Sequence, residues 1–224
     1  MEDLTDNERE EQLRRWWGEN WLWIVGGVAL GLALLGGWQY WQQTRIRSAE
    51  QDEASYLSVL EALGQNQMEQ AVARAKELRD RRPGSPYADQ ADLALARMAV
   101  DRRELDDAAG RLRAVMEGSK DAELRAVART RLARVLLEQG KHDEALALLD
   151  PAGAGAFAAL YREIRGDAYA AKGDAKAAAS EYEAALAAGE DAGIDRAFVE
   201  LKRDALPSAA TVVAAPATAE AGSQ

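Results

Sequence analysis

The residue types that carry enzyme chemistry are scarce in this sequence. The chain has a single histidine, His142, and no cysteine. His142 lies in the segment 140–143, whose composition is typical of an exposed turn between helices, so we interpret it as a turn residue and not as a ligand. Metal sites and Ser-His-Asp catalysis need more such groups, and no GxxxxGK[ST] or GxGxxG phosphate loop occurs. The sequence therefore predicts a protein that is not an enzyme and has no cofactor or metal.

Two arginines offer a different chemistry, the binding of a carboxylate or a backbone carbonyl. Arg97 and Arg134 fall at the same position of a repeated pattern, so we expect them to stack about one repeat apart and to act as a pair. The plainer alternative is that each neutralises a nearby carboxylate, such as Asp101 or Glu138. The remaining carboxylates, at 104–107 and 181–183 for example, have the pattern of solvated helix faces.

The repeat that positions these arginines is clearest in residues 131–152 and 164–185. Aligned at their glycines, the two copies match Ala133 with Gly166, Leu136 with Tyr169, Gly140 with Gly173, Ala145 with Ala178, Leu149 with Tyr182 and Ala152 with Ala185. Small residues at these positions let two helices approach closely, and the larger ones fill the adjacent groove. The separation of 33 residues is close to the ~34 of the tetratricopeptide repeat.

Two weaker copies of the repeat lie upstream, with their turns at Asn66 and Arg103. Each of these turns lies 37 residues before the next turn, which is longer than the standard repeat. We therefore expect short insertions in the linkers at 83–86 and 118–121. Ser85 before Pro86, and Asp174 after Gly173, are typical helix starts. The predicted core positions of the two copies are Val59, Ala62, Ala71, Ala75 and Leu78, and Ala96, Ala99, Ala108, Leu112 and Val115.

The predicted fold is all-α, with one N-terminal transmembrane helix and a tetratricopeptide solenoid of about four helix pairs. A capping helix at 195–206, with Ala197, Phe198 and Leu201 on one face, is expected to cover the last pair. The first helices of stacked pairs line a concave surface, which is the default binding site of a solenoid. The residues that we predict to bind protein there are Tyr56, Leu60, Leu93, Arg97, Arg134, Leu137 and Asp167. Leucines mixed with charges suit a partner's helix or an unfolded apolar segment.

An uncharged stretch at residues 21–41 predicts a permanent membrane anchor. At 1.5 Å per residue it reaches roughly 31 Å, which matches the hydrocarbon core. The six tryptophans of the chain all lie near its two ends, at 16, 17, 21, 23, 38 and 41, as in the aromatic belts that contact membrane lipid. Gly27 and Gly31 form a GxxxG pair that would let another membrane helix pack closely. The alternative is that glycine is simply common in membrane helices.

Charge and composition place the rest of the chain. Arginines before the anchor (Arg9, Arg14 and Arg15) slightly outnumber those after it (Arg45 and Arg47), which favours a cytoplasmic N-terminus. We therefore predict a cytoplasmic tail at 1–20, the anchor at 21–41, a periplasmic solenoid at 42–206 and a disordered tail at 207–224. The absence of cysteine is compatible with the periplasm. A net charge of -10 disfavours nucleic acid as a partner.

The whole arrangement resembles the membrane-anchored tetratricopeptide proteins of the YfgM type, ancillary subunits of the SecYEG translocon in Gram-negative bacteria. The resemblance rests on segments 14–20, 37–41, 131–135, 165–167 and 172–174 and covers nearly the whole chain up to Leu206. It implies a non-catalytic protein of the inner membrane that associates with the translocon and with a periplasmic chaperone of the PpiD type and helps translocating or unfolded polypeptides.

Without this resemblance the sequence leaves more than one function open. A translocon-linked chaperone adaptor and a scaffold for envelope assembly, such as cell division or cytochrome maturation, would use the same solenoid. An enzyme is the third class, and the scarcity of catalytic groups argues against it.

Overall fold

The computed structural model describes residues 6–189 and 192–207. Over these residues the chain forms nine α-helices and two short 3-10 helices and contains no strand, which confirms the all-α prediction. The chain divides into two compact units between Glu53 and Ala54. The tail predicted to be disordered lies, from residue 208 onward, outside the described residues.

The first unit contains most of one long helix, α1 (Asp6–Gly64). An 18-residue window of this helix has a mean hydropathy of 1.7 and no buried residue, so α1 holds one candidate membrane span. Two aromatic side chains at the C-terminal end of the predicted anchor lie close together: the ring centroids of Trp38 and Trp41 are 5.4 Å apart, and the Arg45 guanidinium lies 4.5 Å from the Trp41 ring. Exposed apolar side chains in the middle and tryptophans at the end are typical of a membrane helix.

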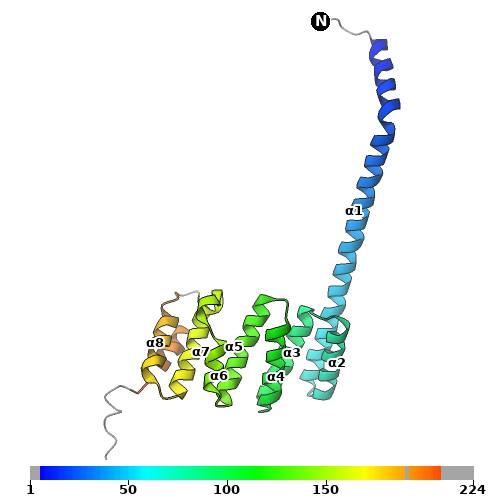
Figure 1. Ribbon diagram of the computed structural model, residues 1–224. Coiled ribbons are helices and arrows are strands. Elements are labelled where there is room, and N and C mark those ends of the chain that lie inside the picture. Colours follow the sequence, from blue (N-terminus) through cyan, green and yellow to red (C-terminus); the bar gives the residue numbers. More distant parts are fainter. Residues whose placement is uncertain (1–5, 190–191, 208–224) are drawn as a thin grey trace, which may run out of the picture. The chain divides into compact units, whose positions relative to one another are not determined.

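The second unit is a series of helix pairs that follow the repeat (Figure 1). Residues 54–64 of α1 share a core cluster with the next two helices. The elements are α2 (Met68–Arg81), α3 (Pro86–Asp101), α4 (Leu105–Gly118), α5 (Ala122–Glu138), α6 (His142–Leu148), η1 (Pro151–Gly153), η2 (Gly155–Phe157), α7 (Ala158–Ala171), α8 (Ala175–Leu186) and α9 (Arg196–Asp204). The helices stand side by side in chain order, so each pair buries its apolar face against its neighbours.

The turns inside the pairs share one backbone conformation. Asn66, Arg103, Gly140 and Gly173 all have positive φ, at 59°, 65°, 74° and 80°. These are the four positions that the sequence alignment equates, so the weak upstream copies follow the same register as the clear ones. Arg103 is unusual here, because a left-handed backbone is strained for a residue with a long side chain. Asp174 also caps α8 as predicted, since its carboxylate accepts a hydrogen bond from Ala177 N at 3.0 Å.

The core uses the predicted alternation of small and large residues. Ala96 and Ala133 share one repeat position and Ala145 and Ala178 share another, and all four are buried. Helices α7 and α8 approach closely where the Tyr182 ring fills the space left by the missing side chain of Gly166. The helices therefore approach closely because small residues lie at their contacts.

Two details of the repeat prediction are wrong. The second helix of the third pair, α6, ends at Leu148, so Ala152 lies exposed in η1 and is not the equivalent of buried Ala185. Pro151 starts η1, and a proline cannot supply the N–H that would continue α6. In the capping helix α9, Val199 is the buried residue, whereas Phe198 and Leu201 are 50% and 63% exposed. The apolar face at Phe198 and Leu201 therefore points away from the repeats.

Candidate protein-binding groove

A groove of about 920 Å³ runs along one side of the second, third and fourth helix pairs. Its lining comes from α3, α4, α5 and α7 and from the turn at Arg103. Apolar side chains alternate with charged ones along it: Ala96, Arg97, Val100, Asp101, Arg103, Leu105, Leu112, Arg131, Arg134, Val135, Leu137, Glu138 and Asp167. Helices α3, α5 and α7 are the first helices of their pairs, the ones that line the inner surface of such a solenoid.

Four of the predicted binding residues lie in this groove and three do not. Arg97, Arg134, Leu137 and Asp167 line it together. Leu60 is partly exposed (36%) on α1, and Tyr56 packs on Tyr87 of α3 with ring centroids 6.1 Å apart. Leu93 is only 5% exposed and belongs to the core. Leu93 therefore presents little surface to a partner, because its helix face turns toward α4 and α5.

The arginines of the groove do not make the ion pairs that the plainer alternative named. Glu138 contacts Arg103, at 3.4 Å, rather than Arg134. Arg134 lies 4.0 Å from Glu163 on α7. Within the part of the chain that the structure describes, the side chain of Arg97 makes no hydrogen bond or ion pair, and neither does that of Arg131. Two guanidinium groups in the groove therefore keep all their donors for a ligand or water.

The carboxylate of Asp167 in the groove and that of Glu163 on the same helix are already paired with a lysine from the capping helix. Lys202 Nζ donates to Glu163 Oε1 at 2.8 Å and to Asp167 Oδ2 at 2.9 Å. Tyr182 donates its hydroxyl to Asp167 Oδ1 at 2.8 Å. Burial of the ring raises the pKa of Tyr182 far above its usual range, and the hydrogen bond to Asp167 raises it further. Asp167 is thus a structural partner of two side chains as well as a groove residue.

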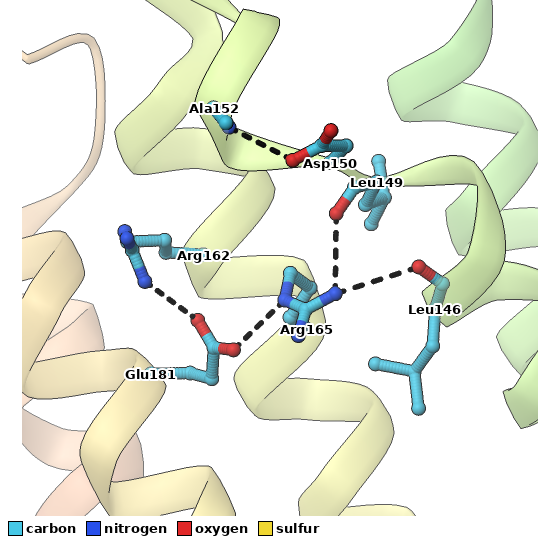
Figure 2. A network of polar contacts seen from close by, with 7 residues as sticks. All are labelled: Leu146, Leu149, Asp150, Ala152, Arg162, Arg165 and Glu181. Atoms are coloured by element: carbon cyan, nitrogen blue, oxygen red, sulfur yellow. Dashed lines mark hydrogen bonds and ion pairs between the residues drawn. The ribbon is translucent and has the colours of Figure 1, made fainter.

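A second polar network fixes α7, the helix that carries Asp167. Arg165 Nε donates to Glu181 Oε1 at 2.8 Å, and its Nη1 donates to the backbone oxygens of Leu149 and Leu146 at 3.2 and 3.5 Å (Figure 2). Arg162 bonds the other oxygen of Glu181 at 3.2 Å. The carbonyls at the end of a helix lack partners inside it, so Arg165 satisfies the end of the short α6. Arg165 therefore links α7 to the end of α6 and to α8.

Some groove residues were missed by sequence reasoning. Arg131 precedes Arg134 by one helical turn, so the helical period places both on the same face and would have found it. Lys202 gives no such signal, because the capping helix stands outside the repeat. Arg103 was assigned only to a turn, yet its side chain reaches the groove.

The remaining sequence predictions concern His142 and the glycine pair of the anchor. His142 is the first residue of α6 and half-buried, not fully exposed, and its Nδ1 is buried without a hydrogen-bond partner in the described chain. No group of three or more histidine, cysteine, aspartate or glutamate side chains placed to hold a metal occurs in the described part. At Gly27 and Gly31 an added Cβ would meet open space, so packing against another membrane helix stays a prediction.

Comparison with known proteins decides the family. The family model described as a tetratricopeptide repeat-like domain matches residues 14–208, which include the apolar span and all helix pairs. An "Ancillary SecYEG translocon subunit" of Escherichia coli is 32% identical over 182 residues, covering 81% of this chain and 87% of the relative. The chain belongs to this family.

Other members of the family agree with this assignment. The "Ancillary SecYEG translocon subunit" of Neisseria gonorrhoeae is 32% identical over 206 residues, covering 91% of this chain and 98% of the relative. The protein of the same name from Haemophilus influenzae is 27% identical, covering 83% of this chain and 91% of the relative. The likeness thus extends over the span and the repeats together.

Proposed function

We propose that this chain is an ancillary subunit of the SecYEG translocon, held in the inner membrane by residues 21–41 and non-catalytic. The observation that carries the proposal is the likeness over most of both chains to relatives that bear this name. One apolar helix near the N-terminus supports a single-pass membrane protein. The groove is formed by residues that follow this helix in the sequence. Its mixture of apolar and charged side chains supports binding of protein and not of a small polar substrate.

The finer part of the proposal concerns partners and orientation. The N-terminus lies in the cytoplasm and residues 42–206 lie in the periplasm, where the groove binds a membrane-bound chaperone of the PpiD type or a polypeptide leaving the channel. Arg97, Arg134, Leu137 and Asp167 form the contact surface, with Tyr56 and Leu60 at the first pair. Gly27 and Gly31 pack against a membrane helix of a partner.

Purification of the full-length tagged chain from detergent-solubilised membranes of its own host tests the partners. Translocon subunits and a membrane-bound periplasmic chaperone are expected together. A matched control keeps the repeats but replaces residues 21–41 by an unrelated membrane span. The amount of translocon that co-purifies with this control should fall more than the amount of chaperone. Recovery of division or haem-lyase components alone would favour the envelope scaffold and contradict the proposal.

The lack of cysteine makes the orientation easy to measure. Single cysteines introduced as Glu10→Cys and Ser180→Cys lie before the anchor and on α8, and both positions are exposed. A maleimide that does not cross the inner membrane should label Ser180→Cys in cells with a permeable outer membrane and Glu10→Cys only after lysis. The reverse pattern would place the groove in the cytoplasm.

A further inference from the structure

The charge of the groove differs from that of the chain as a whole, and this difference points to the chemistry of its partner. We propose that the groove binds an α-helix whose apolar face is flanked by acidic side chains. This inference rests on the proposed function, because it specifies the partner that the groove takes.

The positive charge of the groove remains after internal pairs are removed. Lys202 and Arg134 together balance Glu163 and Asp167, and Arg103 pairs with Glu138, so neither Asp167 nor Glu138 faces the groove unpaired. Arg97 and Arg131 then remain, with no ion pair to any described residue, against the single carboxylate of Asp101. In a chain of net charge -10, this excess selects acidic side chains, to which guanidinium groups donate two hydrogen bonds at once.

An aliphatic floor accompanies these charges. Val100, Leu105 and Leu137 line the groove and are half-buried, so part of each side chain is accessible. A partner that covers them must offer an apolar stripe, and burying such a stripe supplies most of the binding energy. The acidic residues therefore belong beside the stripe, where they reach Arg97 and Arg131.

The lining also decides between a helical and an extended partner. It contains no asparagine, glutamine, serine or threonine, the side chains that can both donate to and accept from the backbone of an extended peptide. The walls are helices, whose own backbone groups bond internally and offer no strand edge. The guanidinium groups could bind some C=O groups of an extended segment, but Asp101 is, among the described residues, the one lining carboxylate left unpaired to accept from its N–H groups, whereas a helix satisfies both kinds of group itself. A volume of about 920 Å³ accommodates about two turns of a helix some 10 Å wide.

Peptide binding to the full-length chain in phosphatidylcholine nanodiscs tests the proposal. Three fluorescent 21-residue peptides share a leucine stripe at positions a and d: one has glutamate at e and g, one has lysine there, and one has glutamate with a central proline that breaks the helix. Anisotropy, with empty nanodiscs as the blank, should show the glutamate helix binding at least about 10-fold more tightly than either other peptide. Added salt should weaken it.

Variants then locate the interaction. Arg97→Gln and Arg131→Gln should each weaken binding of the glutamate helix by about 3-fold, and together by about 10-fold. Arg97→Glu with Arg131→Glu should reverse the preference toward the lysine helix. Arg113→Gln removes an exposed arginine of α4 outside the groove and should change nothing.

Three results would overturn the inference: equal affinity of the unaltered chain for the glutamate and lysine helices, equal affinity for the proline peptide, or no binding of any peptide at 1 mM. These comparisons use the unaltered chain, so misfolding of a variant does not affect them. Recovery of the translocon in the purification above, combined with any of these results, would reject the acidic helix and keep the proposed function. Loss of the translocon would reject the proposed function itself.

Discussion

The Tyr182 ring on α8 lies so close to Gly166 on α7 that a Cβ added to the glycine would stand 2.4 Å from ring atom Cε1. The ring cannot easily move away, because its hydroxyl donates to Asp167 at 2.8 Å. Glycine and tyrosine at these two positions are therefore one packing unit, with the large side chain of one helix seated on the bare backbone of the other.

Substitution of Gly166 should show how tightly this unit is packed. Gly166→Ala forces the ring outward and should lower the free energy of unfolding by about 2 kcal/mol, with a fall in Tm of roughly 4–8 °C measured by circular dichroism. Gly110→Ala is the matched control, because Gly110 is an exposed residue inside α4 whose added Cβ meets open space. That control should stabilise the protein by up to about 1 kcal/mol. Equal effects of the two substitutions would disprove the close contact.

The network at Arg165 predicts a local loss of stability. Arg165→Met leaves the carbonyls of Leu146 and Leu149 without this donor and should cost about 2 kcal/mol. Hydrogen exchange should quicken first in α6, whose end the arginine holds. Arg162→Met, which removes only one bond to Glu181, should cost less than about 1 kcal/mol. Exchange that quickens equally throughout the second unit would speak against a local role.

The raised pKa of Tyr182 predicts a loss of stability in alkali. Below pH about 10 the phenol keeps its proton in both the folded and the unfolded chain, and its contribution is complete. Above that pH the unfolded chain releases the proton while the folded chain retains it, so the free energy of unfolding falls as pH rises. Urea unfolding at pH 9 and 11 should therefore show a smaller decrease for Tyr182→Phe than for the unaltered chain. The same decrease in both would contradict the assignment.

The capping helix offers a test of which of its faces is buried. Val199→Ala should cost about 2 kcal/mol, because the side chain is fully buried. Phe198→Ala removes a larger side chain but should cost less than about 1 kcal/mol, since half of that residue is exposed and its ring lies 4.7 Å from Lys202 Nζ. Thermal unfolding of both variants measures these losses of stability. A larger loss for Phe198→Ala than for Val199→Ala would mean that the face with Phe198 is the buried one, as the sequence pattern favoured.

The sequence predicted the helix pairs well because small residues and turns recur at fixed positions. Ala133, Gly166 and the turns at Asn66 and Arg103 follow from that recurrence, and the structure confirms their register. The pattern fails where the repeat stops. The apolar residues of α9 alone favour the face with Phe198 and Leu201. The hydrogen bonds of Lys202 to Glu163 and Asp167 instead hold the opposite orientation, in which Phe198 and Leu201 are exposed.

The groove was predictable only in part for a related reason. Repeat position identified Arg97 and Arg134 as neighbours on one surface, and both line the groove. Sequence spacing does not reveal which carboxylate a flexible arginine contacts: Glu138 pairs with Arg103, and Arg134 lies near Glu163. Leu93 illustrates the same limit, because adjacent faces of one helix form the inner surface and the core, and leucine suits both.

Photocrosslinking in growing cells is the most direct test of the central claim, that an anchored repeat protein grips translocon-associated proteins with its groove. A photoreactive residue is placed at Arg97 in the groove or at Lys176, an exposed residue of α8 outside it. The account predicts that Arg97 gives products with a translocon or chaperone subunit and that Lys176 does not. Products from Arg97 with lipid and unrelated proteins alone would contradict it.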